Sequence, residues 1–255
     1  LGIHFFPMLP QYHILNGDAL KYQFPKALKG KLIIARECFI EGTTKGDDFD
    51  SFFANRANFI CKNYGETKEN YLKNVKSEFQ KILDINQNCE INLWFEHDLF
   101  CQANLWFVTS LIIENPSLKT IFLIMPKEHS QYGFSRLSET ELTLAYKHRK
   151  LVHNILDFAK LWQYYQNNEL GRLKQMAINL QEEFPFILPA VEAHIARIPQ
   201  ENYPERPVAS ILSIMNELQT DDFTLIFREF CKRESIYGFG DLQVKKLVEQ
   251  ASAYK

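Results

Sequence analysis

The sequence lacks the motifs that identify several large enzyme classes. Its 255 residues contain no Gly-x-Ser-x-Gly nucleophile elbow and no Gly-x-Gly-x-x-Gly fingerprint, so an ordinary α/β hydrolase or a dinucleotide enzyme is not supported. The five cysteines include no Cys-x-x-Cys pair. Their odd number and wide spacing predict neither a disulfide framework nor a zinc ribbon. Such cysteine usage is typical of a reducing cytoplasm, which is therefore the predicted location.

A strong charge of one sign and a long apolar run are also missing. The net charge is -2, so no global basic field attracts nucleic acid, and nucleic acid is not an expected partner. The last section, 204–255, carries seven Lys or Arg against eight Asp or Glu, which argues against a DNA-reading tail. The longest apolar stretch, Leu105–Ile113, is interrupted by Thr109 and Ser110 and predicts a buried helix and no membrane span.

The first half of the chain alternates short apolar runs with helical spacing. This alternation is typical of an α/β fold with a mostly parallel, Rossmann-like sheet flanked by helices. The expected strands are Tyr12–Leu15, Lys31–Ala35, Ile91–Phe95 and Lys119–Met125. The expected helices run from Asp18 to about Phe24, from Phe49 to Ile60, from Tyr71 to Leu83 and from Phe100 to Ile113.

The pattern changes after Pro126, and an all-helical C-terminal part is expected. A polar loop is predicted at Glu128–Phe134, and Ser138 with Glu141 forms a capping-box signal for a helix start. The helices predicted from there are Leu142–Tyr165, Leu170–Phe184, Phe186–Ile198, Pro207–Leu218, Phe223–Glu234 and Leu242–Tyr254. The predicted domains are therefore an α/β domain at 12–126, a helical section at 135–200 and a small three-helix domain at 204–255.

Three polar turns each follow one of the predicted strands. They are Asn16-Gly17-Asp18, Arg36-Glu37 and Glu96-His97-Asp98. In an open α/β sheet the carboxyl ends of the parallel strands gather along one edge, where ligands bind. The sequence therefore predicts a polar, carboxylate-rich ligand site at this edge.

The first two turns each allow two interpretations. Backbone N–H groups near Asn16 and Gly17 could bind an anion at a helix start. Asp18 can cap that helix and competes with an anion there, so a capped turn without a ligand is favoured for this motif alone. Arg36 could bind the carboxylate or phosphate of a ligand through two hydrogen bonds. Alternatively, it could form an internal salt bridge with Glu37, Glu96 or Asp98. Arg56 could reach the same edge, although a solvated helix arginine is the favoured interpretation.

The third turn is the best candidate for chemistry. Asp98 is placed to cap the following helix, and Gln102 lies on the same helix face. Crowded carboxylates can shift a pKa toward neutrality, and carboxylates with a histidine could hold a divalent metal, although the spacing matches no metal motif. The alternative is that Asp98 caps, Glu96 pairs with Arg36 and His97 is exposed. Cys38 and Cys101 are expected to be small buried hydrophobes.

The candidate residues therefore fall into two groups. The candidates for acid/base or metal chemistry are Asp18, Glu37, Glu96 and Asp98. The candidates for ligand binding are Asn16, Gly17, Arg36, His97 and Gln102.

Several of these motifs also resemble a known family. The segments HILNGDAL (13–20), REC (36–38) and LWFEHDLFCQ (93–102) are similar to the bacterial domain-of-unknown-function family numbered 1835. Further matches are Leu161-Trp162, Phe186–Pro189 and the tail segment Tyr237–Gln243, so the resemblance runs from His13 to about Leu247. It implies the positions of the motifs and a small helical domain after the first, and it adds no chemistry.

Two functions remain open. The first is an enzyme acting on a small phosphorylated or nucleotide-like substrate, for which a divalent metal could serve as cofactor. The second is a non-catalytic module that senses a small polar ligand or binds a protein partner, with the helical sections passing on the bound state.

Overall fold

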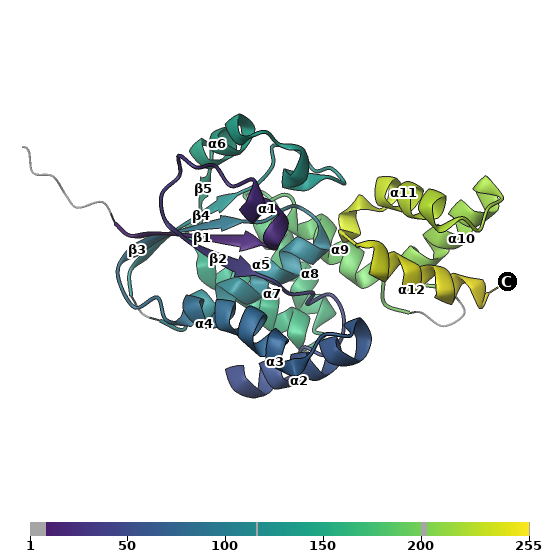
Figure 1. Cartoon of the computed structure of the whole chain (residues 1–255), viewed down its shortest axis with the longest axis horizontal. Helices are drawn as coiled ribbons and strands as arrows, with labels where there is room; N and C mark the ends of the chain where they lie inside the picture. Colours follow the sequence, from purple (N-terminus) through teal and green to yellow (C-terminus); the bar gives the residue numbers. More distant parts are fainter. Residues whose placement is uncertain (1–8, 116, 200–202, 255) are drawn as a thin grey trace, which may run out of the picture.

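A single five-stranded sheet organises the chain. The computed structural model describes residues 9–115, 117–199 and 203–254. The strands are β1 (Gln11–Asn16), β2 (Lys31–Ala35), β3 (Cys89–Trp94), β4 (Lys119–Ile124) and β5 (Lys150–Leu151), in the order β2-β1-β3-β4-β5. The first four are parallel and β5 is antiparallel to β4 (Figure 1). The mostly parallel sheet expected from the sequence is thus confirmed.

The strand order creates a switch point between β1 and β3. The chain leaves β1 toward β2 on one side and later returns to pair β3 on the other side of β1. In doubly wound sheets, ligands bind in the crevice outside the carboxyl ends of the strands at such a reversal. Asn16 ends β1 and Glu96 follows β3 by two residues, so both lie at this crevice.

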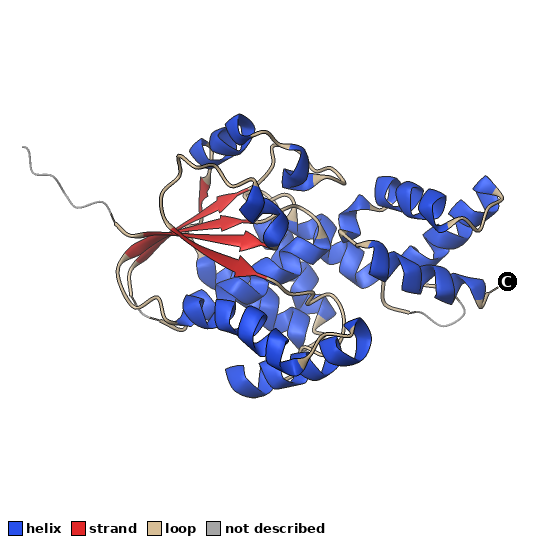
Figure 2. Cartoon of the chain, in the orientation of Figure 1, coloured by secondary structure: helices blue, strands red, loops and turns tan. Residues whose placement is uncertain are grey.

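Helices cover both faces of the sheet (Figure 2). The α-helices are α1 (Asp18–Tyr22), α2 (Phe49–Tyr64), α3 (Lys68–Tyr71), α4 (Ser77–Leu83), α5 (Leu99–Ile112), α6 (Glu139–Lys147), α7 (Ile155–Gln166), α8 (Leu170–Leu180), α9 (Ile187–Ala196), α10 (Arg206–Leu218), α11 (Phe223–Arg233) and α12 (Asp241–Ser252). Shorter turns are the π-helical η1 (Leu72–Lys76) and the 3-10 helices η2 (Gly133–Arg136) and η3 (Ser235–Tyr237). None of the helices described is long and apolar enough to cross a bilayer.

Alternate residues of each central strand face two different apolar clusters. Ile14 and Leu93 belong to a large cluster on the face covered by α5, whereas Leu15 and Trp94 belong to a smaller cluster under α1 and α6. Burial on both faces explains why the strand segments are continuous apolar runs. All but two residues of α5 are buried, because α4, α7 and α9 pack around it.

One predicted helix is wrong. The segment Leu142–Tyr165 is not one helix, because α6 ends at Lys147, β5 follows, and α7 begins only at Ile155. Lys150 and Leu151 pair with β4, and the Val152 backbone N–H donates to the Ile121 carbonyl at 2.8 Å. Completing the sheet edge thus overrides the helical spacing, and a two-residue strand is too short to show the alternation that identifies strands.

The last three helices form a compact tail, here defined as 203–254. Helices α10, α11 and α12 confirm the three predicted tail helices, with η3 and a left-handed Gly238 between the last two. The tail contacts α5 and α9 through η3 and shares one apolar cluster with the sheet. The domain boundaries expected from the sequence stay a prediction.

Candidate functional site

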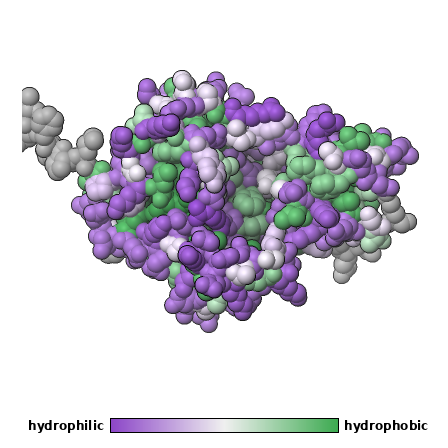
Figure 3. Space-filling view, in the orientation of Figure 1, coloured by the Kyte–Doolittle hydropathy of each residue, from purple (hydrophilic) through white to green (hydrophobic). Residues whose placement is uncertain are grey.

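A cavity of about 240 Å³ lies at the switch point and is closed by the tail. Figure 3 shows the hollow between the tail and the rest of the molecule. We call it the site cavity. Its lining comes from the turns after β1 and β3, the start of α5, the 130–132 loop and the tail: Asn16, Glu96, Asp98, Phe100, Cys101, Ser130, Gln131, Tyr132, Phe230, Cys231, Glu234, Ser235, Gly238 and Phe239.

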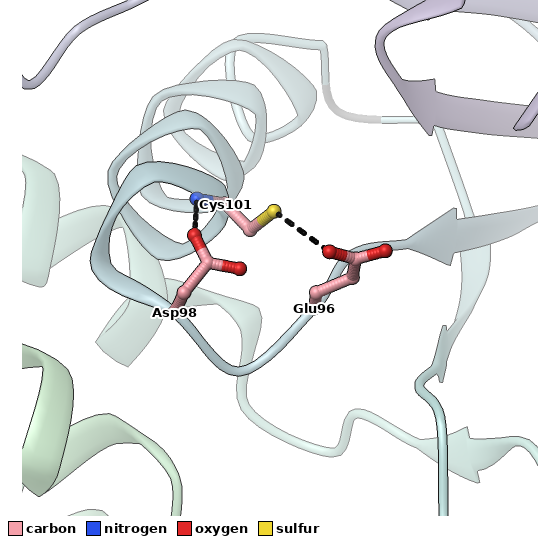
Figure 4. Close-up of side chains that lie close together, drawn as sticks. All are labelled: Glu96, Asp98 and Cys101. Atoms are coloured by element: carbon pink, nitrogen blue, oxygen red, sulfur yellow. Dashed lines mark hydrogen bonds between the residues drawn. The ribbon is translucent and has the colours of Figure 1, made fainter. Parts of the chain in front are cut away.

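Glu96, Asp98 and Cys101 converge on one wall of the site cavity (Figure 4). One oxygen of each carboxylate and the Cys101 sulfur lie within 4.8 Å of one another. Asp98 is the N-cap of α5, and its Oδ1 accepts the Cys101 backbone N–H at 2.9 Å, as predicted from the sequence. The Cys101 thiol donates to Glu96 Oε2 at 3.8 Å. The cap therefore fixes the thiol beside both carboxylates.

Burial raises the pKa of all three groups. Loss of water contact, and secondarily the neighbouring Asp98, raises the pKa of Glu96 to about 7. Burial also raises the pKa of Asp98, against the opposing effect of its hydrogen bonds with Cys101. Burial, with the two carboxylates next in effect, raises the pKa of the Cys101 thiol well above its usual value. A pKa of about 7 lets Glu96 exchange a proton near neutral pH.

Amide side chains hold this wall in place. Asn16 Nδ2 donates to the Cys101 sulfur at 2.9 Å, and Asn104 Nδ2 donates to Asn16 Oδ1 at 2.8 Å. Gln102, which is fully buried, donates from Nε2 to the Glu96 carbonyl at 2.7 Å. Asn16 thus lines the site cavity, whereas Gln102 donates to the Glu96 backbone and does not line it.

Two glycines with left-handed backbones sit directly on the carboxylates. A Cβ on Gly133 (φ +48) would lie 2.0 Å from the Glu96 carboxyl carbon, and one on Gly238 (φ +63) would lie 2.1 Å from Asp98 Oδ1. The Phe134 backbone N–H also donates to Glu96 Oε1 at 2.6 Å. The η2 loop and the tail can therefore close over the site only because these positions carry no side chain.

The first predicted turn forms a separate ion pair. Gly17 with φ +85 is the N-cap of α1, and Asp18 makes no cap hydrogen bond, so the expected Asp18 cap is wrong. Instead, Asp18 accepts two hydrogen bonds from Arg36, at 2.5 and 2.8 Å, and Glu78 lies 3.7 Å from the same guanidinium. The hydrogen bonds with Arg36 hold the pKa of Asp18 below its usual value.

Glu37 belongs to a buried structural network. Its carboxylate accepts from Arg56 Nε at 2.9 Å and from Nη2 at 2.7 Å, and Tyr71 donates its hydroxyl to the same group. Arg56 is fully buried, so the expectation of a solvated arginine is wrong. The expected bridge from Arg36 to Glu37, Glu96 or Asp98 is also not found among the described residues, because Arg36 bonds to Asp18 and Glu37 is used by Arg56.

Arg36, Glu37 and Cys38 line a neighbouring cavity of about 580 Å³. It shares Phe100 and Gly238 with the site cavity. Cys38 is half-buried and accepts a hydrogen bond from tail residue Gln243 at 3.6 Å, and burial raises the pKa of its thiol to about 12. Of the predicted residues, Asn16, Glu96 and Asp98 therefore line the site cavity, and Arg36 and Glu37 line the adjoining one.

His97 is not among the residues that line the site cavity. Its ring packs edge-on against two other rings, with centroid separations of 5.8 Å to His129 and 5.9 Å to Phe186. Burial and the neighbouring His129 lower the pKa of His97 to about 4, so the ring is neutral near neutral pH. The alternative of an exposed His97 is wrong, because the side chain is half-buried between these rings.

Sequence reasoning missed several site residues. Cys101 was expected to be only a buried hydrophobe, although its position three residues after the Asp98 cap places its backbone N–H on that carboxylate. The tail residues Glu234 and Phe239 and the loop residue Gly133 come from distant segments, and no local pattern identifies them.

The site offers two carboxylates and a thiol that could hold a divalent cation such as zinc, which accepts oxygen and sulfur ligands. A scan against models of protein families finds no match for this chain. A search of curated proteins likewise finds no matching relative. The resemblance to the domain-of-unknown-function family stays a prediction.

Proposed function

We propose that this chain is an enzyme that performs acid–base chemistry on a small polar molecule in the site cavity. The observation that carries this proposal is the convergence of Glu96, Asp98 and Cys101 within 4.8 Å on the cavity wall. The cavity lies at the switch point of the sheet, where ligands bind in this class of fold. Perturbed carboxylates at such a position are typical of functional sites.

Glu96 has the properties of a general acid or base. A group with a pKa about 7 is present in both protonation states near neutral pH, so it can donate or accept a proton during a reaction. In this mechanism Asp98 raises the pKa of Glu96 and fixes the start of α5, while Cys101 and Asn16 hold the neighbouring wall.

The charge of the residues that line the site cavity limits which ligands can bind there. None of the described lining residues is Lys or Arg, whereas Glu96, Asp98 and Glu234 supply carboxylates. A neutral or cationic molecule with N–H donors, such as a nucleobase or nucleoside, fits this lining directly. A phosphorylated molecule would enter together with a divalent cation, which Glu96, Asp98 and Cys101 could bind. The free cysteines described support a cytoplasmic location for this activity.

A ligand-sensing module is the second candidate function. Phe230, Glu234 and Phe239 of the tail form the far wall of the site cavity. A bound molecule would therefore contact the sheet edge and the tail together and could fix their relative position without any reaction. Asp18 and Arg36 form an ion pair with each other. Neither charge is therefore left free for catalysis, which is compatible with a protein that binds a ligand without reacting with it.

One experiment separates the two functions. Wild type, Glu96→Gln and the control Asp18→Asn would be screened by thermal shift against nucleosides, nucleotides and divalent metals, alone and combined. Each stabilising compound would then be incubated with a catalytic amount of protein and followed by NMR. Gln at position 96 can still accept the Phe134 backbone N–H, so Glu96→Gln should keep the fold.

The enzyme proposal expects turnover of a bound compound and a loss of about 10²–10⁴-fold in Glu96→Gln, with Asp18→Asn near wild type. A compound that binds wild type and is recovered unchanged would support the sensing module. If no compound stabilises the protein, or if Glu96→Gln binds and turns over a compound like wild type, the enzyme proposal fails.

A further inference from the structure

A second and more apolar cavity lies beside the sheet edge, separate from the site cavity. It measures about 560 Å³, and we call it the edge cavity. Its walls come from the end of β4, the loop before α6, α6 itself, β5 and the start of α9: Leu123, Met125, Pro126, Lys127, Leu137, Glu141, Leu144, Ala145, His148, Lys150 and Phe186. A cavity of this size with mostly apolar walls and a few polar groups is typical of small-molecule sites.

The apolar wall is partly open to solvent. Leu144, on α6, is 50% exposed although it lines the edge cavity. Met125 and Phe186 are half-buried, so they too retain surface that a ligand could cover. Grouped, solvent-facing apolar side chains on a concave surface indicate a binding site more strongly than isolated ones.

The polar groups of the edge cavity are mostly basic. The ionisable residues that line it are three basic ones and one acid, namely Lys127, His148, Lys150 and Glu141. Glu141 is already used at the start of α6, where it accepts from the Ser138 backbone N–H at 2.8 Å and the hydroxyl at 2.7 Å.

Neither lysine is neutralised by a carboxylate. Within residues 9–115, 117–199 and 203–254, neither Lys127 nor Lys150 forms an ion pair with an acidic side chain. Lys150 instead donates to the Glu183 carbonyl and lies 4.5 Å from the Phe184 ring centroid. Two lysines at an apolar cavity thus leave positive charge available to an anion.

We propose that the edge cavity binds a small amphipathic carboxylate, namely an unbranched medium-chain fatty acid. Its hydrocarbon chain lies against Leu123, Leu144 and Phe186, where it removes apolar surface from water. Its carboxylate lies near Lys127 and Lys150. The proposal does not depend on chemistry in the site cavity.

Calorimetric titration of the whole chain with fatty acids tests this proposal. Octanoate, decanoate and dodecanoate would be used below their micelle concentrations. Affinity should rise about fourfold for each added methylene, as expected for burial of a hydrocarbon chain. Decanol and decyltrimethylammonium carry the same chain with other head groups, and decanoate should bind roughly tenfold more tightly than either.

Two variants and a matched control locate the site. Lys127→Glu combined with Lys150→Glu should weaken decanoate binding about tenfold or more and leave decanol binding unchanged. Leu144→Asp, at an exposed position that tolerates substitution, should weaken both ligands. Lys245→Glu alters an exposed lysine of α12 and should bind like wild type.

The proposal is overturned if decanoate shows no saturable binding, if the three head groups bind equally, or if affinity does not depend on chain length. It is also overturned if the double lysine variant and Leu144→Asp, with melting temperatures close to wild type, bind decanoate as wild type does.

Discussion

Glu37 is buried and Glu96 is half-buried. Both follow strands at the carboxyl edge of the sheet, but their neighbours differ. Glu37 is paired with the buried Arg56 guanidinium, whereas Glu96 lies beside Asp98 and Cys101 and forms no ion pair among the described residues. The first arrangement stabilises a charge, and the second penalises one. The neighbours therefore separate Glu37, a carboxylate with a structural partner, from Glu96, the proposed acid–base group.

Replacing Glu96 by Gln should remove a pH-dependent loss of stability. The folded pKa is raised from 4.5 to about 7, so the folded state holds the Glu96 proton more tightly than the unfolded chain does. Wild type should therefore lose about 2–3 kcal/mol of unfolding free energy as the pH rises from about 4.5 to about 7. Chemical denaturation should show Glu96→Gln as more stable than wild type near pH 8, and near pH 5 the two should be closer. Parallel pH profiles for the two proteins would contradict this.

Glu37→Gln should instead be strongly destabilising. The substitution leaves the fully buried Arg56 guanidinium without its carboxylate, which typically costs about 3–5 kcal/mol. Asp18→Asn, which breaks the half-exposed pair with Arg36, should cost less than about 1 kcal/mol. Denaturant unfolding of both variants measures the difference. A Glu37→Gln variant as stable as wild type would return Glu37 to the candidate catalytic groups.

At the scale of single elements, the loops that cover the site depend on glycine. A Cβ at Gly133 or Gly238 would collide with the Glu96 or Asp98 carboxylate, whereas the equally left-handed Gly65 (φ +71) has nothing within 4 Å. Gly65→Ala should therefore cost only the backbone strain, about 1–2 kcal/mol. Gly133→Ala and Gly238→Ala should cost more, because a carboxylate or the covering loop must also move.

Denaturant unfolding of the three glycine variants provides the comparison. Equal losses at all three positions would mean that the loops do not pack closely on the carboxylates. Equal losses would therefore contradict the close packing that shields the Glu96 carboxylate from water.

Strong local patterns made most elements predictable. The continuous apolar runs identified β1 to β4, and the Ser138 and Asp98 caps marked the starts of α6 and α5. Strand β5 was missed because its two residues show no periodicity and its pairing with β4 is a long-range contact. The π-helical turn η1 inside the predicted helix Tyr71–Leu83 likewise has no local signal in the sequence.

At the scale of the whole molecule, the strand order brings the predicted turns to one edge, and the tail then divides them. Gly238 and Phe100 separate the site cavity, with Glu96 and Asp98, from the neighbouring cavity, with Arg36 and Glu37. The sequence predicted the shared edge from the strand pattern. It could not predict this division, because the choice of partners depends on side chains and tail residues far apart in the chain.

The central claim is that closure by the tail and the η2 loop makes Glu96 a carboxyl group that titrates near neutrality. The most direct test is an NMR titration of the whole chain labelled with ¹³C at the glutamate carboxyl carbon, with the Glu96 signal assigned through Glu96→Gln. We predict a titration midpoint at about 7. A midpoint near the ordinary value of about 4.5 would show that Glu96 is not shielded in this way and would contradict its role as the acid–base group.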